Sequence, residues 1–228
     1  MLPLKRTERS QREKTIRQWD EIFASKNTAI PQHKNSGNTE FDKSLFWLIQ
    51  KADSIIDFGC ADGNLLFLCS QYGTVRHIGI DLSSQAIANA KKRLTDVSGQ
   101  QSFQFTCGGT EALQDLESSS MDAAILSNIL DNLYPEDAHC VLTQMKRILK
   151  PKGRLLVKLN PCLSAEQISE YKIKPIGENL YDDGMLLWNN PTEEWDRILE
   201  QYFRRNKFKT IYYKELDLYQ RLYELERT

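Results

Sequence analysis

An eight-residue segment rich in glycine and aspartate, DFGCADGN at residues 57–64, carries the clearest chemical signal in the sequence. It follows the apolar run Ser54–Phe58 and precedes an apolar helical stretch that begins at Leu65. Gly59 and Gly63 let the backbone turn tightly and approach a ligand closely, and a helix that begins there offers unpaired N–H groups. The pattern is typical of the loop at which an open α/β sheet binds a nucleotide-like ligand, although glycines that only shape a turn give the same pattern.

Asp81 is a second residue that could bind such a ligand. It ends the apolar run Val75–Ile80. In a sheet of this class, an acidic side chain at this place reaches the two hydroxyl groups of an adenosine ribose. A carboxylate that caps the following helix or lies at the surface is the alternative, and Asp81 alone does not decide between the two.

Asp131 is a candidate for acid–base chemistry on a second substrate. It lies shortly after the apolar run Ala123–Ser127, and a carboxylate there could remove a proton from an amine or a hydroxyl group. An ordinary loop or capping role is the simpler interpretation, and we favour it. The histidines His33, His77 and His139 are far apart in the sequence, and we expect structural roles for them.

The elements that must position these residues follow from the apolar pattern. Helical stretches alternate with five short apolar runs, which predict the centre of a mostly parallel sheet. One helix is predicted to begin at Ser83 and a second at Pro135, the latter stopped by Pro151 and Gly153. The five predicted strands are 54–58, 75–80, 103–106, 123–127 and 154–159.

The two ends of the chain predict additional elements around this sheet. Ile16, Trp19, Ile22 and Phe23 give the N-terminal segment one apolar helical face, and the stretch 27–38 has the composition of a loop. A helix is predicted to begin near Pro191, and a terminal hairpin from about residue 208 is preferred over a helix. We therefore expect one domain, 1–228, that consists of a helical cap or lid (1–36), a ligand-binding core (37–160), an insertion (161–190) and a C-terminal helix with hairpin (191–228).

The composition excludes several classes of protein. The chain has 228 residues and a net charge of -1, so it lacks the global positive field that drives nonspecific binding to nucleic acids. Five dispersed cysteines show no metal-ligand spacing, and we expect no metal site. No apolar stretch of about 18 residues could span a bilayer. We expect a soluble, cytoplasmic protein without a membrane partner.

Four segments, IIDFGCADG, IGIDLSSQAI, MDAAILSNIL and RILKPKGRLLV, occur in this order over about residues 50–160. Together they resemble the class I S-adenosylmethionine-dependent methyltransferases, in particular the small-molecule group. The resemblance implies a Rossmann-like α/β fold, with a mostly parallel seven-stranded sheet, a C-terminal antiparallel hairpin and an N-terminal helical cap. A nicotinamide-binding domain is the nearest competitor, but its pattern requires a glycine at position 64, where this chain has Asn64.

The resemblance also implies which residues contact the cofactor, S-adenosylmethionine. Asp57 would orient the methionine ammonium group, and Asp81 would hold the ribose hydroxyl groups. This chain departs from the family pattern at two places: Ala61 replaces the middle glycine, and Gly109 stands where an aspartate is common. The remaining implied cofactor contacts are Gly59, Cys60, Gly63, Leu82, Thr110 and Ser127.

The resemblance implies less about the acceptor than about the cofactor. The small-molecule group often has an acidic residue followed by histidine where this chain has Asp131-Asn132. The (D/N)-P-P-(Y/F) signature of exocyclic-amine methylation is absent after the fourth predicted strand. Its absence argues against base-specific methylation of DNA and against methylation of glutamine. In this family the N-terminal segment and the segment 161–190 usually wall the acceptor pocket. Their aromatic residues could select a cationic or planar acceptor, although core packing explains them more simply. These candidates are Trp19, Phe23, Tyr171, Tyr181 and Trp188.

The favoured hypothesis is therefore methyl transfer to an oxygen, nitrogen or carbon nucleophile of a small-molecule acceptor. An RNA or protein methyltransferase and a non-catalytic S-adenosylmethionine-binding module are the alternatives. Two basic clusters could form an RNA-facing surface if they lie together, but solvated surface positions are the simpler explanation. These clusters are Lys5, Arg6, Arg9, Arg12, Lys14 and Arg17, and Arg204, Arg205, Lys207 and Lys209.

Overall fold

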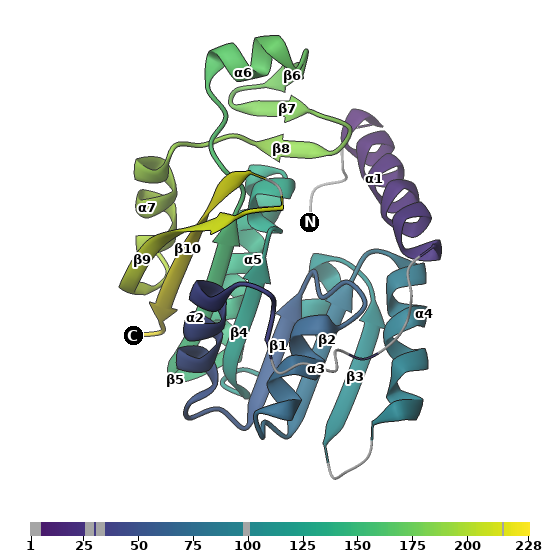
Figure 1. Ribbon diagram of the computed structural model, residues 1–228, viewed down its shortest axis with the longest axis vertical. Coiled ribbons are helices and arrows are strands. Elements are labelled where there is room, and N and C mark those ends of the chain that lie inside the picture. Colours follow the sequence, from purple (N-terminus) through teal and green to yellow (C-terminus); the bar gives the residue numbers. More distant parts are fainter. Residues whose placement is uncertain (1–5, 26–29, 31–34, 98–100, 216) are drawn as a thin grey trace.

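The main sheet has seven strands in the order β3-β2-β1-β4-β5-β10-β9 (Figure 1). The computed structural model describes residues 6–25, 30, 35–97, 101–215 and 217–228. Strands β1 to β5 are parallel, whereas β10 runs antiparallel to β5 and β9 antiparallel to β10. This is the predicted sheet with its C-terminal hairpin. The strands are β1 Ser54–Phe58, β2 Arg76–Asp81, β3 Ser102–Cys107, β4 Met121–Ser127, β5 Leu149–Leu159, β9 Arg204–Tyr213 and β10 Leu218–Glu226.

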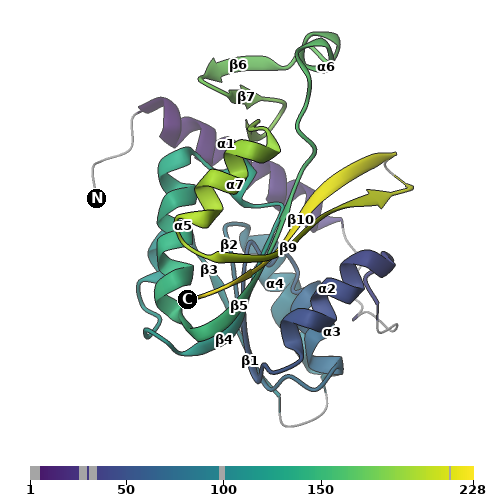
Figure 2. The ribbon, with the colours of Figure 1, turned by 90° about the vertical axis from the view of Figure 1, so that its left-hand side faces the viewer.

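Helices cover both faces of this sheet (Figure 2). The buried apolar residues accordingly form one cluster on each face. Because β1 is covered on both sides, all five of its residues are buried, as is usual for central parallel strands. One face carries α2 Thr39–Ile49, α3 Asn64–Gln71 and α4 Ser84–Arg93, and the other carries α5 Pro135–Ile148 and α7 Thr192–Glu200.

The end of α5 and the start of β5 differ from the prediction. The helix ends at Ile148, and β5 begins at once, so that Pro151 and Gly153 lie within the strand and not between helix and strand. Leu149 pairs with Met121 of β4, and the pairing is irregular before it resumes at Ala123 and Arg154. The first residues of β5 therefore form a bulged extension, which the charged and proline-containing sequence does not reveal.

The terminal hairpin is confirmed, and its first strand is longer than predicted. β9 begins at Arg204, four residues before the apolar residues that signalled it. Because β9 is an edge strand, charged residues are tolerated there without any apolar alternation. β10 is buried along most of its length, so its residues show no single apolar face.

A second, smaller sheet was not predicted. The segment 161–190 forms α6 Ala165–Glu170 and three antiparallel strands, β6 Lys174–Gly177, β7 Leu180–Asp182 and β8 Leu186–Trp188. This sheet lies above the main sheet in Figure 1, and β8 packs against the short helix η3 Leu130–Asn132 that follows β4. Its strands are three or four residues long, too short for a clear alternation.

The N-terminal helix α1 Arg6–Ala24 packs against α4, beside the carboxyl ends of the parallel strands (Figure 1). The predicted loop at 27–38 and His33 lie largely or wholly outside the described residues, as does Lys5 of the first basic cluster. In the described part of the chain, no helix is long and apolar enough to cross a bilayer. The elements therefore leave one end of the sheet, where the parallel strands finish, covered only by α1 and the small sheet.

Candidate functional site

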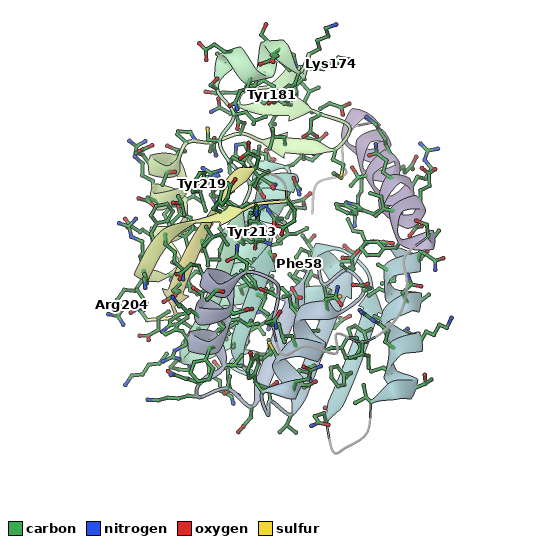
Figure 3. The ribbon with its side chains drawn as sticks, viewed as in Figure 1. Phe58, Lys174, Tyr181, Arg204, Tyr213 and Tyr219 are labelled. Carbon is green, nitrogen blue, oxygen red and sulfur yellow. The ribbon has the colours of Figure 1, made fainter. Side chains whose placement is uncertain are left out.

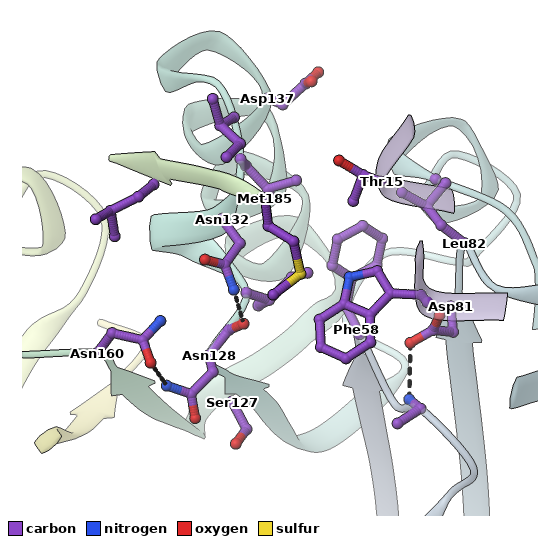
Figure 4. Close-up of a pocket in the computed structure, with 18 of the residues that line it drawn as sticks. Thr15, Phe58, Asp81, Leu82, Ser127, Asn128, Asn132, Asp137, Asn160 and Met185 are labelled. Carbon is purple, nitrogen blue, oxygen red and sulfur yellow. Dashed lines mark hydrogen bonds between the residues drawn. The ribbon is translucent and has the colours of Figure 1, made fainter. Parts of the chain in front are cut away.

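A cavity of about 500 Å³ lies at the carboxyl ends of the parallel strands (Figure 4). Loops after β1, β2, β4 and β5 contribute Gly59, Asp81, Asn128 and Asn160 to its lining. Helix α1 adds Trp19, and β8 with its preceding turn closes another side. Since β1 and β4 are neighbours whose connections run in opposite directions, the cavity lies at the switch point where open α/β sheets bind ligands.

The glycine-rich loop after β1 requires its glycines. Gly59 and Gly63 have φ values of 81° and 82°, in the left-handed region that other residues rarely adopt. A Cβ atom at Gly63 would lie 2.8 Å from the ring of Phe105, and one at Gly59 would lie 3.1 Å from the side chain of Ile129. Ala61 also has a positive φ, 52°, so its replacement of the middle glycine carries backbone strain.

Arg93 of α4 holds the far end of this loop. Its guanidinium group donates to the carbonyl oxygen of Asp62 over 2.6 Å and to Oδ1 of Asn64 over 2.7 Å, and it lies over the Phe67 ring. The side chain of Arg93 is only 3% exposed. Asn64, the residue that separates this loop from the nicotinamide-binding pattern, thus has a structural partner that a glycine could not replace.

Asp81 joins the loops after β1 and β2. Its Oδ2 accepts a hydrogen bond from the backbone N–H of Ala61, and its Oδ1 accepts one from that of Ser83, both over 2.8 Å (Figure 4). Burial raises the pKa of the carboxyl group, and these two hydrogen bonds oppose the rise. A carboxylate has about four acceptor sites, so two remain for the hydroxyl groups of a ribose in the cavity that Asp81 lines.

Asp57 lies behind this loop and is 1% exposed. Burial raises its pKa to about 8, and the negative charge of Asp81 adds to the rise. Among the described residues, no hydrogen-bond partner contacts its Oδ1. A buried carboxylate oxygen without a partner is costly, and a ligand ammonium group would satisfy it. The residues present therefore fit the cofactor that the sequence motifs imply.

The other implied cofactor residues divide into two groups. Leu82, Thr110 and Ser127 line the cavity, as does Gly109. Cys60 and Gly63 do not line it, because Cys60 is packed under the loop near Gly79 and Gly63 faces the Phe105 ring. Cys60 and Gly63 thus shape the loop from behind.

The glycine at position 109 is explained by α1. A Cβ atom at Gly109 would collide with the guanidinium group of Arg12 and would lie 2.9 Å from the carboxylate of Glu111. Glu111 accepts from the Gly109 N–H over 2.8 Å and pairs with Arg12 over 3.4 Å. A side chain at this position would require Arg12 and Glu111 to move.

Helix α1 is fixed to the start of α4 by Asp20. The Asp20 carboxylate accepts from the Ser83 hydroxyl group over 2.6 Å and from the Gln85 N–H over 3.0 Å. The Ser83 hydrogen bond lowers its pKa. Asn89 of α4 donates to the carbonyl oxygen of Phe23, and Lys14 pairs with Asp182 of β7 over 2.9 Å. α1 therefore bridges α4 and the small sheet across the cavity.

Two of the five aromatic acceptor candidates, Trp19 and Phe23, line the cavity, with ring centroids 6.0 Å apart. The other three do not. Trp188 is buried against Trp195, with ring centroids 5.0 Å apart. Tyr171 is 59% exposed at the end of α6, and Tyr181 lies on β7, one strand beyond β8 and the cavity. These three predictions are corrected by the small sheet, which the sequence did not reveal.

Asp131 is not among the described residues that line the cavity. It is 1% exposed, and its Oδ2 accepts from the backbone N–H of Asn160 over 2.6 Å. Burial raises its pKa to about 6. Asp131 therefore ties the end of β5 to the turn after β4, which favours the structural role over that of a base.

Three asparagines in the cavity lining were not recognised as a group from the sequence. Asn128 and Asn132 follow β4, and Asn160 follows β5. Asn128 Nδ2 donates to Asn160 Oδ1, and Asn132 Nδ2 donates to the Asn128 carbonyl oxygen, both over 2.8 Å (Figure 4). The neighbouring positions of β4 and β5 bring them together, and only the sheet order could have indicated it.

The two basic clusters do not lie together. Arg204 lies at the edge of the molecule opposite α1 (Figure 3), where it pairs with Glu226. Arg205 pairs with Asp196, and Lys209 with Glu40. In the first cluster, Arg12 and Lys14 have the acidic partners already described. The described side chains of the two clusters therefore form no single basic surface.

Two of the curated proteins that resemble this chain are named as methyltransferases. The tRNA N(3)-methylcytidine methyltransferase trm140 of Schizosaccharomyces pombe is 24% identical over 196 residues, which cover 82% of this chain and 64% of that protein. The tRNA N(3)-cytidine methyltransferase METTL6 of Rattus norvegicus is 26% identical over 174 residues, which cover 69% and 60%. This chain thus spans less than two thirds of the length of these relatives.

Solved structures share the fold. The N-methyltransferase NodS of Bradyrhizobium japonicum, in complex with S-adenosylhomocysteine, superposes with a TM-score of 0.67 at 15% identity, over 94% of this chain and 98% of NodS. The 1,6-didemethyltoxoflavin-N1-methyltransferase of Burkholderia thailandensis gives 0.65 at 14% identity, over 100% of this chain and 93% of that one. Residues 49–214 match the family model described as a methyltransferase domain, and this chain belongs to that family.

Proposed function

We propose that this enzyme methylates a ring nitrogen of a cytosine-like base carried by RNA. The observation that carries the proposal is the asparagine group Asn128, Asn132 and Asn160 in the wall of the cavity. Amide side chains offer both a donor and an acceptor, so they recognise the edges of planar heterocycles.

The hydrogen bonds within this group determine what remains for a ligand. The Asn128 carbonyl oxygen accepts from Asn132 Nδ2, so Oδ1 of Asn132 is left without a partner in the part of the chain that the structure describes. Asn128 donates to Asn160, which leaves Asn128 Oδ1, whereas the side chain of Asn160 is also hydrogen-bonded to Asp131. The two acceptors, Oδ1 of Asn128 and Oδ1 of Asn132, suit the amino group of cytosine, which lies beside the ring nitrogen.

Apolar side chains supply the faces for such a ring. Trp19, Phe23, Tyr134 and Met185 line the same cavity. Stacking on aromatic rings, with hydrogen bonds at the edges, is the usual way in which proteins hold an unpaired base. A cavity of this volume suits small ligands, so a base would enter alone while its RNA strand stays outside.

The reaction needs no general base with this acceptor. The lone pair of the ring nitrogen forms the new N–C bond while the bond from the methyl group to sulfur breaks and leaves its electron pair on sulfur. The positive charge moves from the sulfonium to the heterocycle, and no proton has to leave the reacting nitrogen. The chain's task is then positioning and exclusion of water, which is consistent with the absence of Asp131 from the described cavity lining.

Both sets of relatives support a nitrogen acceptor. The two curated relatives are named for tRNA N(3)-cytidine methylation, and they favour an RNA-borne base over the free small molecule that the sequence motifs suggested. The Burkholderia thailandensis enzyme is named for N1 of a planar heterocycle. The missing exocyclic-amine signature is no obstacle, because a ring nitrogen carries its own lone pair.

The test is methyl transfer from radiolabelled S-adenosylmethionine to three acceptors: unmodified tRNA transcripts, single-stranded oligoribonucleotides and free cytidine. Digestion of the RNA and mass spectrometry then locate the methyl group. Label on a cytosine ring nitrogen in RNA supports the proposal. Label on cytidine alone, or at an oxygen or carbon atom, contradicts it, as does the absence of transfer by protein that binds the cofactor.

The asparagine group is tested with Asn132→Ala. Loss of one hydrogen bond to a neutral base predicts a kcat/KM about 10-fold lower, with S-adenosylmethionine affinity unchanged within about twofold. Asn206→Ala is the matched control, because Asn206 is exposed on β9 and away from the cavity lining. Equal kcat/KM values for both variants would show that Asn132 does not contribute to base recognition.

A further inference from the structure

Arg221 of β10 places a buried guanidinium group at the junction of the main sheet and the insertion 161–190. The residue is 4% exposed. Its Nε donates to the carbonyl oxygen of Asn160 over 2.9 Å, and its Nη1 donates to that of Asn190 over 2.8 Å. Asn160 directly precedes the insertion and Asn190 is its last residue. One side chain of the main sheet therefore contacts the chain at both ends of the insertion.

The insertion depends on such contacts for its position. In the described part of the chain, none of its strands pairs with a strand of the main sheet. Asn189 accepts from the N–H of Leu163 and donates to the carbonyl oxygen of Leu163, both over 2.8 Å. These two hydrogen bonds join the ends of the insertion to each other, whereas those of Arg221 join the same ends to β10.

The chemistry of arginine suits this task. The planar guanidinium group carries its N–H donors in a fixed geometry, so two carbonyl groups bound to different nitrogens are held in a fixed relative position. Burial lowers the pKa of Arg221, and the negative charge of Asp131 opposes this change. The carboxylate of Asp131 also accepts from the backbone N–H of Asn160. Both backbone polar groups of Asn160 are thus held by buried charged side chains.

These contacts determine the position of two parts of the cavity wall. The side chain of Asn160 belongs to the lining and accepts from Asn128. The insertion contributes Leu163, Met185 and Leu187 to the same lining. A shift at either end of the insertion would displace this wall. The glycine-rich loop lies on the other side of the cavity and has its own contacts with Asp81 and Arg93.

We propose that Arg221 is a positioning residue for the acceptor: by joining both ends of the insertion to β10, it fixes the wall against which the acceptor binds. Arg221 is not among the described residues that line the cavity, so it acts through Asn160 and the insertion. The inference rests on the proposed function, because the acceptor is assigned to this wall there, but it does not depend on which acceptor is bound.

The first test needs no acceptor. Hydrogen exchange of the full chain, saturated with S-adenosylhomocysteine, compares the wild type with Arg221→Lys, which keeps a positive charge near Asp131 but lacks the planar fork. Exchange at the backbone amides of Leu163 and Asn189 should rise about 10-fold, whereas exchange in residues 59–63 should not change. Arg197→Lys is the control, because Arg197 is an exposed arginine of α7. Equal exchange in Arg221→Lys and the wild type overturns the proposal.

The second test separates positioning from stability. With unmodified tRNA transcripts as acceptor, Arg221→Lys should raise the acceptor KM about 10-fold, while kcat and the S-adenosylmethionine dissociation constant stay within about twofold. A variant that is only less stable has a smaller folded fraction, which lowers kcat at an unchanged KM. Such a result, or unchanged kinetics, shows that Arg221 only satisfies two buried carbonyl groups and overturns the proposal.

A second variant covers the case in which Arg221→Lys does not fold. Asn189→Ala removes the two hydrogen bonds to Leu163 but leaves the buried charges of Arg221 and Asp131 in place, and it should also raise the acceptor KM. An unchanged KM in folded Asn189→Ala then contradicts the proposal. Absence of methyl transfer to RNA by the wild type contradicts the proposed function alone, and the exchange comparison then decides the role of Arg221.

Discussion

The cavity has two halves that are built in different ways. The cofactor half consists of the loops after β1, β2 and β3, within residues 57–113. Two of its contacts join a backbone N–H group to a side chain two residues away, and the third joins the neighbouring loops after β1 and β2. The acceptor half combines α1, the turns after β4 and β5, and the small sheet, so that Trp19, Asn132, Asn160 and Met185 meet there. Local geometry determines the first half, whereas long-range packing determines the second.

This difference implies that the two halves respond differently to substitution. In the cofactor half, the single half-buried carboxylate of Asp81 joins the loops after β1 and β2, and its loss should abolish ligand binding. In the acceptor half, each element contributes one or two contacts, so single changes should have graded effects. The following predictions test this contrast.

Asp81→Ala should have the largest effect. It removes the acceptor of two backbone N–H groups and the proposed partner of the ribose, so the affinity for S-adenosylmethionine should fall at least about 100-fold. Calorimetry measures the affinity, and Asp115→Ala, at an exposed position, is the control. Micromolar binding by a folded Asp81→Ala protein would contradict the role of Asp81.

Strand β2, which ends at Asp81, should also carry a specific dependence of stability on pH. His77 is 1% exposed between the Thr74 hydroxyl group and the Ser102 carbonyl oxygen, and burial lowers its pKa from 6.5 to about 4. The folded chain thus holds neutral His77, and the unfolded chain takes up the proton first. The stability that this provides is complete above about pH 6.5 and is lost as the pH falls toward 4, by about 2–3 kcal/mol.

Chemical denaturation between pH 7 and pH 4 measures this loss. His77→Gln should flatten the pH dependence. An unchanged slope in this variant would mean that other groups cause the acid sensitivity.

Asp20→Ala should have a moderate effect that reaches the acceptor half. Loss of the hydrogen bonds to Ser83 and Gln85 resembles the loss of a helix cap, and it should lower stability by about 1–2 kcal/mol, or Tm by roughly 3–6 °C. Because α1 carries Trp19 and Phe23, acceptor KM should rise more than the cofactor dissociation constant. Glu21→Ala, at an exposed neighbouring position, is the control. An unchanged acceptor KM would show that the hydrogen bonds of Asp20 do not affect acceptor binding.

Ala61→Gly should have the smallest effect and the opposite sign. Glycine adopts the φ of 52° at this position without a steric penalty, so stability should rise by about 1 kcal/mol or slightly less. Asn179→Gly is a comparison at φ 53°, where asparagine already tolerates the conformation and donates a hydrogen bond to Asn190, so this variant should gain no stability. A destabilised Ala61→Gly protein would show that the alanine methyl group contributes packing that offsets the strain.

The sequence predicted the cofactor half far better than the acceptor half. The loop at 57–64 and Asp81 could be recognised because glycines and an aspartate at the ends of apolar strands have consequences within a few residues. Asn160 could not be recognised, because only the pairing of β4 with β5 places it beside Asn128. Trp188 was misassigned because an aromatic residue that packs in the core has the same sequence signature as one that lines a pocket.

The small sheet of β6, β7 and β8 shares no strand pairing with the main sheet. Its residues form one continuous segment of the chain between β5 and α7, so natural variation or engineering can exchange the whole segment at once. Such an exchange would alter the cavity wall at Met185 and Leu187 but leave the glycine-rich loop and Asp81 unchanged. One cofactor scaffold can thereby acquire new acceptors over evolutionary time without having to evolve its methyl-donor chemistry again.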